Sequence, residues 1–177
     1  MGFEARSWPA NGGTAGDVIA SYGVRTTNGK FGAAQNTDDI VQSAMWDFTY
    51  SDLPDGASDA LGLNLVIPAN STIVSAKLII DTAFASTSTT TDMLIGLVRA
   101  TDGTTEIDLD GLITAAQATQ TTIGVVGAVI DGASGTPGAL IGKLSDATYD
   151  GVLTVTTSAA DLTAGAGRII VEYILNS

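Results

Sequence analysis

The sequence contains no cysteine and no histidine, and these two absences exclude several kinds of chemistry. Without cysteine the fold cannot depend on disulfides, and neither a thiolate metal ligand nor a cysteine nucleophile is present. Without histidine the commonest general base and the imidazole metal ligand are missing, together with every Ser-His-Asp and Cys-His catalytic arrangement. We therefore expect a protein that is not an enzyme and that needs no cofactor.

Positive charge is also scarce, since seven basic residues face nineteen acidic ones and the formal net charge is −12. The basic residues are scattered, so no run of positive charge can neutralise successive phosphates. We expect no binding to nucleic acid or to an anionic membrane, and the shared negative charge favours a soluble chain that does not clump with its own copies. The basic positions are Arg6, Arg25, Lys30, Lys77, Arg99, Lys143 and Arg168.

Long apolar runs are missing as well. Hydrophobic residues make up 45% of the chain, yet no apolar run approaches the roughly 18 residues that a membrane-spanning helix needs. Residues 1–9 show no apolar stretch after a basic one, so we expect no cleaved secretion signal. A length of 177 residues suits one domain with a single core.

Glycine is concentrated near the N-terminus, where only isolated apolar positions separate the turns. This pattern predicts an irregular glycine-rich arm at residues 1–36, followed by a β-sandwich domain at residues 37–177. Such an arm either becomes ordered against a neighbouring subunit or is a loosely packed leader with no partner, and the sequence leaves both interpretations open. The glycines of this segment include Gly12, Gly13, Gly16, Gly23, Gly29 and Gly32.

Alternation of apolar and polar residues follows this segment and is typical of β-strands. Trp46, Phe48 and Tyr50 fall on one side of the first extended segment. In the clearest strand, residues 73–82, the more apolar face consists of Val74, Ala76, Leu78, Ile80 and Thr82. Further strands are predicted at residues 60–66, 93–99, 105–109, 125–130, 151–157 and 168–175.

Turn-forming clusters separate these strands at residues 86–91, 101–103, 131–138 and 163–167. A rhythm of short strands and such turns predicts an all-β antiparallel sandwich or barrel. The last predicted strand, residues 168–175, is apolar on both faces, which suits a central strand or a subunit interface. One short helix is predicted at residues 111–119, where Leu112, Ile113 and Ala116 share a face.

Glu106, Asp108 and Asp110 are the candidate metal ligands, because acids at alternate positions before Gly111 resemble the opening half of a calcium loop. The remainder of the loop does not match. The first position is not Asp, and Gln117 stands where a bidentate Glu is expected. The simpler interpretation is a strand end whose acids face solvent, and we favour it, so no metal site is predicted.

Three other motifs have structural interpretations that we prefer. Residues 135–144 resemble a phosphate loop, but Leu144 occupies the magnesium-binding position, so a turn followed by a short strand is expected. Asn70 begins a glycosylation-type triplet that more simply forms a turn before a strand. Acids available for a two-carboxylate hydrolase are interpreted as solvated surface residues, and they include Asp38, Asp39, Asp47 and Asp59.

Three segments, at residues 67–81, 108–113 and 162–174, together resemble the proteins that decorate or cement the capsids of tailed bacteriophages. The resemblance implies a β-sandwich of jelly-roll type that forms a homotrimer on the outer surface of the virion. It also implies binding to the major capsid protein and stabilisation of the joints between its subunits. None of the three segments carries catalytic chemistry.

A second function is also compatible with a jelly-roll-like pattern, namely a carbohydrate-binding or tail-fibre-type adhesion module. A two-carboxylate enzyme is the third hypothesis. It requires two acids within about 5 to 10 Å of each other beside an aromatic platform.

Overall fold

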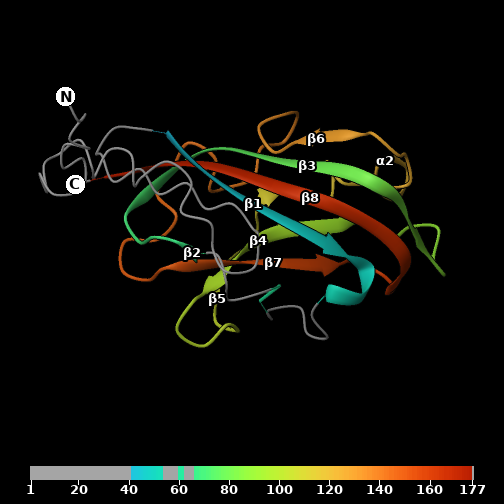
Figure 1. The fold of residues 1–177 in the computed structure, drawn as a ribbon, viewed down its shortest axis with the longest axis horizontal. Coiled ribbons are helices and arrows are strands. Elements are labelled where there is room, and N and C mark those ends of the chain that lie inside the picture. The colour runs from blue at the N-terminus through green and yellow to red at the C-terminus, as the bar shows by residue number, and fades with distance from the viewer. Residues whose placement is uncertain (1–40, 54–59, 62–65, 177) are drawn as a thin grey trace, which may run out of the picture.

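The computed structural model describes residues 41–53, 60–61 and 66–176, which form two antiparallel four-stranded sheets packed face to face (Figure 1). The first sheet has the order β1-β8-β3-β6, with strands Val41–Thr49, Leu162–Leu175, Ser71–Ser86 and Val129–Asp131. The second has the order β2-β7-β4-β5, with strands Val66–Ile67, Gly151–Thr157, Met93–Arg99 and Glu106–Ile113. The predicted all-β sandwich is confirmed, whereas the predicted arm lies outside the described residues.

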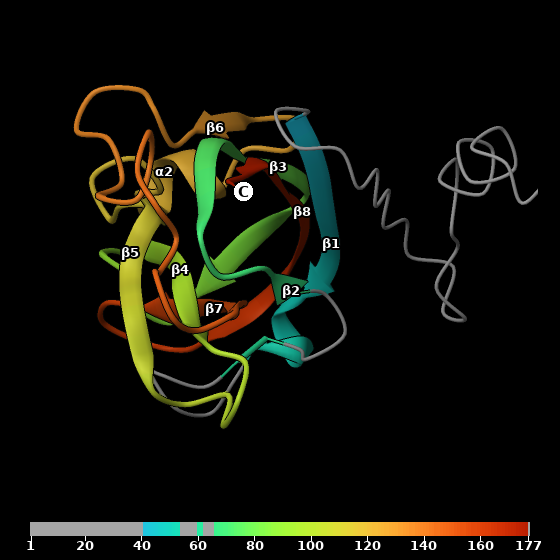
Figure 2. The same cartoon turned by 90° about the vertical axis from the view of Figure 1, so that its left-hand side faces the viewer.

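In the described part of the chain, successive strands alternate between the two sheets, except that the consecutive strands β4 and β5 share a sheet. Each sheet therefore combines strands from early and late parts of the chain, as the view along the long axis shows (Figure 2). Two four-stranded sheets connected in this way make the sandwich jelly-roll-like. β8 lies between β1 and β3, so the last strand is the central one that its two apolar faces indicated.

The core lies between the sheets and contains mostly aliphatic side chains with a few aromatic ones. Trp46 and Phe48 of β1 are each 3% exposed. The ring of Phe48 stacks on Phe84 of β3, with ring centroids 5.6 Å apart and planes inclined by 20°. Full burial of a side chain such as Phe contributes about 1.5 to 3 kcal/mol, so these contacts tie the edge strand β1 to the centre of its sheet.

Strand β3 departs from its predicted alternation at both ends. Ile73 is buried, whereas Val74 is 39% exposed, so the prediction for Val74 is wrong. The register with β8 shifts between Ile73 and Ser75, which makes Val74 the extra residue of a β-bulge. Inserting one residue moves the neighbouring side chains to opposite faces. A second shift, between Ile80 and Thr82, leaves Thr82 exposed, against the prediction.

The helix predicted at residues 111–119 is wrong, because β5 continues to Ile113. Leu112 and Ile113 are both fully buried, and Ile113 pairs with Ile95 of β4. A short apolar run fits a helix and a buried strand equally well, and pairing with a neighbouring strand decides between them. The α-helix of the described chain is α2, at Gln120–Ile123, and a 3-10 helix, η1, occupies Tyr50–Asp52.

The remaining strand predictions divide into three groups. β4 and β7 lie at the predicted residues, and β1 is confirmed except that Tyr50 belongs to η1. The strand predicted at residues 60–66 falls largely on residues 62–65, outside the described residues, and β2 is Val66–Ile67. The strand predicted at residues 125–130 is shorter, because β6 begins only at Val129.

The turn predicted at residues 163–167 is also wrong, since this segment belongs to β8. Gly165 has a φ of 126°, a conformation that L side chains rarely adopt. Its backbone passes directly over the ring of Phe84, where a Cβ atom would collide with the ring. The glycines therefore keep the strand close to an aromatic core residue and do not end it. None of the helices in the described part of the chain is long and apolar enough to span a membrane.

Candidate docking surface

The first sheet carries aliphatic side chains on the side that faces away from the core. In β8, Ile169, Val171 and Tyr173 point into the core, so the alternate residues point outward. Cross-strand pairing places Val41 beside Ile174 and Met45 beside Ile170, while Ile79 pairs with Arg168. We call this surface the outward face, and its apolar members are Val41, Met45, Ile79, Ile170 and Ile174.

The outward face differs from the corresponding side of the second sheet. Val41 is 49% exposed, and the other four apolar members are partly exposed. In the second sheet, Val98, Val152 and Thr154 also lie outside the central core cluster, yet each has an exposed fraction of 0%. A sheet with one face on the core normally presents polar residues on the other. The aliphatic residues of the outward face therefore mark a candidate contact surface.

Charged groups on the outward face are held in defined positions. Arg168 binds Asp81 through two parallel hydrogen bonds of 2.8 Å, from Nε to Oδ2 and from Nη2 to Oδ1. This partner raises the pKa of Arg168 above its ordinary value. On the adjacent strands β3 and β8, the Ser75 hydroxyl donates a 2.6 Å hydrogen bond to the Glu172 carboxylate. Paired charges beside aliphatic residues give the surface polar features that a partner could recognise.

A second set of exposed apolar side chains lies in the loop that leads into β6. Val125, Val126 and Val129 are 54%, 63% and 59% exposed, and we call residues 125–129 the valine loop. The Gly127 amide donates a 2.8 Å hydrogen bond to the Ile80 carbonyl, which anchors the loop to β3. Because the turn is tied to the sheet, its valines are presented without the full entropic cost of ordering a free loop.

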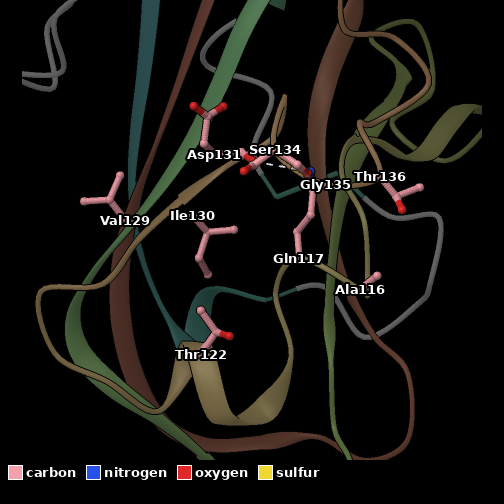
Figure 3. A pocket seen from close by; sticks show the side chains of 9 residues that line it. All are labelled: Ala116, Gln117, Thr122, Val129, Ile130, Asp131, Ser134, Gly135 and Thr136. Carbon is pink, nitrogen blue, oxygen red and sulfur yellow. Dashed lines mark hydrogen bonds between the residues drawn. The ribbon is translucent and has the colours of Figure 1, made fainter.

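Next to the valine loop is a pocket of about 420 Å³. Val129, Ile130 and Asp131 lie on one side of it and Ala116, Gln117 and Thr136 on the other (Figure 3). Among the residues that the structure describes, no aromatic one lines this pocket. The described lining thus offers no flat ring on which a sugar could stack, and it gives no support to the carbohydrate-binding hypothesis.

Gln117 closes one side of the pocket with its side-chain amide. Nε2 donates to the carbonyls of Asp131, Gly132 and Ser134 at 3.2, 3.0 and 2.6 Å, and Oε1 accepts a 2.8 Å hydrogen bond from the Thr114 amide. This side chain holds the loop after β6 and does not point to a metal-ligand role. From the sequence, Gln117 was noted only because it stands where a calcium loop would have a bidentate Glu. Its role in holding this loop was not predicted.

The structure brings two of the three candidate metal ligands together. Asp108 Oδ1 accepts a 3.3 Å hydrogen bond from the Asp110 amide. The pKa of Asp108 is raised, mainly because the carboxyl is partly buried and secondly because it shares a hydrogen bond with the Asp110 side chain. Glu106 is exposed at the start of β5. In the described residues no three acidic side chains gather into a group that could hold a metal ion.

Residues 135–144 do not form a phosphate cradle, because their amides are used within the fold. Leu140 donates to the Gly111 carbonyl at 2.8 Å, and Lys143 donates to the Leu140 carbonyl at 3.0 Å. The strand predicted there is also wrong, since the segment is a series of turns with a single bridge between Leu144 and Thr72. Pairing with β5 and β3 takes up the backbone groups that a phosphate would need.

The other candidate residues fall at separate places. Asp47 is exposed on β1, whereas Asp38, Asp39 and Asp59 lie outside the described residues. Asn70 adopts a φ of 58° in the turn that precedes β3, as the turn interpretation requires. Its side-chain amide donates a 2.9 Å hydrogen bond to the Asn176 carbonyl.

Comparison with known proteins finds a shared fold but no sequence family. No family model and no curated protein matches the chain. A chain in the structure of the capsid of Ralstonia phage GP4 aligns with a TM-score of 0.50 at 17% identity, covering 81% of this chain and 90% of that one. At this identity the likeness concerns the fold alone.

Two further solved structures contain weaker matches. The acidic stable capsid of Helicobacter pylori bacteriophage KHP30 gives a TM-score of 0.45 at 17% identity, covering 80% of this chain and 92% of that one. A chain in the capsid asymmetric unit of cyanophage Pam1 gives a TM-score of 0.40 at 14% identity, covering 81% of this chain and 90% of that one.

Proposed function

We propose that this protein is a non-enzymatic structural component of a bacteriophage virion. It binds the outer surface of the capsid as a homotrimer and stabilises the joints between subunits of the major capsid protein. The observation that carries the proposal is a jelly-roll-like sandwich with exposed aliphatic surfaces. The fold shared with a chain of the Ralstonia phage GP4 capsid supports it over most of both chains.

The charge and the surface of the chain suit this function. A net charge of −12 makes copies repel one another in solution, which opposes random association before the shell is reached. Exposed aliphatic residues then contribute binding when a complementary surface is available. On a symmetric lattice the same small contact is repeated many times, so that rupture of the shell must break several contacts together.

We assign the capsid contact to the valine loop. Its three valines are more exposed than any apolar member of the outward face, and the hydrogen bond from Gly127 to Ile80 fixes their position. A few residues at the desolvated centre of a contact carry most of its binding free energy. A homotrimer places three such loops on one particle, and each increases the local concentration of the others at the lattice.

The direct test is co-sedimentation of the purified protein with a panel of emptied, expanded tailed-phage capsids that includes the capsid of Ralstonia phage GP4. We expect saturable binding to at least one shell at physiological salt. Val126→Asp should weaken this binding about tenfold or more, because it places a charge in the desolvated contact. Thr104→Asp, which adds the same charge at another exposed position, in the turn between β4 and β5, is the matched control.

Absence of binding to every shell in the panel would overturn the proposal. Equal losses with Val126→Asp and Thr104→Asp would retain the function but reject the valine loop as the contact. Light scattering tests the oligomer separately, and a homotrimer requires three times the 17.9 kDa mass of one chain.

A further inference from the structure

Four apolar side chains of the outward face lie together on the neighbouring strands β1 and β8 (Figure 1). Val41 pairs with Ile174, and Met45 pairs with Ile170 four residues further along β1. A strand rises about 3.3 Å per residue, so the two pairs lie about 13 Å apart on the same side of the sheet. We call these four residues the apolar strip.

The exposure of the apolar strip is that of an uncovered sheet face. Val41 begins the end strand β1 and is 49% exposed, while Met45, Ile170 and Ile174 are partly exposed. β8 lies between β1 and β3, and strands only about 4.8 Å apart cover much of each other's side chains from the side. The exposure that remains is directed away from the sheet, where a partner can cover it.

The charged residues of the outward face include both signs. Lys77 and Arg168 lie there, so the face holds two of the four basic residues in the described part of the chain. Lys77 is exposed and lies directly opposite Ile170 of the apolar strip. Elsewhere in the described residues, nine acidic residues accompany only two basic ones. The outward face is therefore less one-sided in charge, and its four acidic residues are Asp47, Asp81, Asp131 and Glu172.

We propose that the apolar strip is the contact between copies of this chain, an inference that rests on the proposed function and names the surface of its homotrimer. A second copy carries the same net charge of −12, so most of the surface repels it. On the outward face, Lys77 of one copy can meet a carboxylate of the next while the apolar side chains leave water together. A strongly basic partner would instead find more opposite charge on the rest of the molecule.

The size of the face suits a contact that is specific but weak. The nine residues of β1 extend about 30 Å, and the three strands β1, β8 and β3 are together roughly 14 Å wide, which gives a flat area of about 400 Å². Projecting side chains expose more surface than this, and a standard interface buries about 800 Å² per partner. We therefore expect a trimer that forms at high protein concentration and dissociates on dilution.

The apolar strip and the valine loop lie on different parts of the first sheet. The sheet order places β3 between β8 and β6, and the valine loop leads into β6. Two partners can thus contact the chain together, a second copy over β1 and β8 and the capsid beside β6. Strips turned toward a threefold axis leave all three valine loops outside the contact between copies.

Light scattering of the full chain over a range of concentrations tests the contact. Val41→Asp should raise the concentration at which half of the chain is trimeric by about tenfold or more, because it places a carboxylate in the desolvated strip. Val126→Asp is the matched control and should leave that concentration unchanged. It makes the same exchange at a valine that is 63% exposed, and both variants increase the self-repulsion of the chain by one charge.

Alkylation of a single thiol measures the same contact without a change of charge. The natural chain has no cysteine, so Val41→Cys introduces one thiol in the apolar strip. This thiol should react with iodoacetamide several-fold more slowly in the concentrated trimer than after dilution to the monomer. The thiol of Val126→Cys, in the valine loop, should react at the same rate in both samples.

A natural chain that stays monomeric at every concentration would overturn the inference, as would a trimer that Val41→Asp and Val126→Asp weaken equally. Equal alkylation rates of Val41→Cys in trimer and monomer would reject the apolar strip as well. Capsid binding is measured separately by co-sedimentation. A trimer disrupted only by Val41→Asp that binds no shell would support the strip and reject the proposed capsid contact, whereas a monomer that binds a shell would do the reverse.

Discussion

The backbone of Gly165 lies against the ring of Phe84, closer than any residue with a Cβ atom could approach. Gly165 belongs to the long central strand β8, and Phe84 belongs to its neighbour β3, where the Phe84 ring also stacks on Phe48 of β1. One residue without a side chain thus allows three adjacent strands to meet around one ring. The fold depends on a pair of residues that lie far apart in the sequence.

The first prediction concerns this contact. Gly165→Ala should lower the free energy of unfolding by about 2 to 4 kcal/mol, because the methyl group collides with Phe84 and the residue keeps a positive φ. Denaturant unfolding measures the change. Gly142→Ala is the matched control, since Gly142 has a φ of 77° and open space where its Cβ would lie.

Gly142→Ala should lower the free energy of unfolding by only about 1 kcal/mol, because backbone strain is its only cost. Equal losses in the two variants would show that packing against Phe84 contributes nothing at Gly165.

The second prediction concerns Gln117, whose amide holds three carbonyls of the loop after β6. Gln117→Leu removes these hydrogen bonds and should therefore lower the free energy of unfolding by about 1 to 3 kcal/mol. Hydrogen exchange should accelerate at the Ser134 amide, which donates to the Asp131 carbonyl at 3.0 Å. Slow exchange at Ser134 in this variant would contradict the role given to Gln117.

The third prediction concerns the pH dependence of the turn between β4 and β5. Hydrogen bonds from the hydroxyl and amide of Thr105 and from the amide of Thr104 lower the pKa of Asp102 from 3.8 to about 2. The ionised carboxylate is favoured in the folded state, so its contribution to stability is present above the ordinary pKa of 3.8 and is lost as the pH falls through about 2.

Titration of the Asp102 carboxyl by NMR measures this shift directly. Thr105→Val should move the Asp102 pKa back toward its ordinary value, since the hydroxyl of Thr105 is the largest single cause of the shift. Thr101→Val, at an exposed position in the same turn, is the control. An unchanged Asp102 pKa in the Thr105 variant would contradict this account.

The fourth prediction concerns Asp108, whose pKa is raised by burial and by Asp110. A raised carboxyl pKa favours the protonated form in the folded state, so the stability it contributes is present in acid and is lost as the pH rises. Asp108→Asn should therefore stabilise the chain at neutral pH, and this advantage should disappear below pH 3.8, the ordinary Asp pKa.

Calcium provides the complementary measurement at this place. With no group of three acids in the described residues, we expect millimolar calcium to leave the unfolding midpoint of the natural chain unchanged. A calcium-dependent increase that is lost in Asp108→Asn would restore the metal-site interpretation.

Several elements were predictable from the sequence because their signal is local. β4 and β7 are short segments bounded by turn-forming residues, and the structure places them at the predicted residues, Met93–Arg99 and Gly151–Thr157. The two apolar faces of the last strand indicated a central position, and β8 lies there. The candidate surface was less predictable, because exposure of Val125 and Val126 depends on where β6 begins.

By itself the sequence determined the all-β class, the acidic surface and the absence of cysteine and histidine chemistry, since these follow from composition and local periodicity. Only the tertiary structure decided that Val74 is a bulge, that residues 111–113 are strand, and that Gly165 continues β8. Each of these depends on a partner distant in the chain: β8 for Val74, β4 for Ile113 and Phe84 for Gly165. A cross-strand pairing or a backbone contact with a ring leaves no periodic trace in either segment alone, because it exists only when the two are brought together.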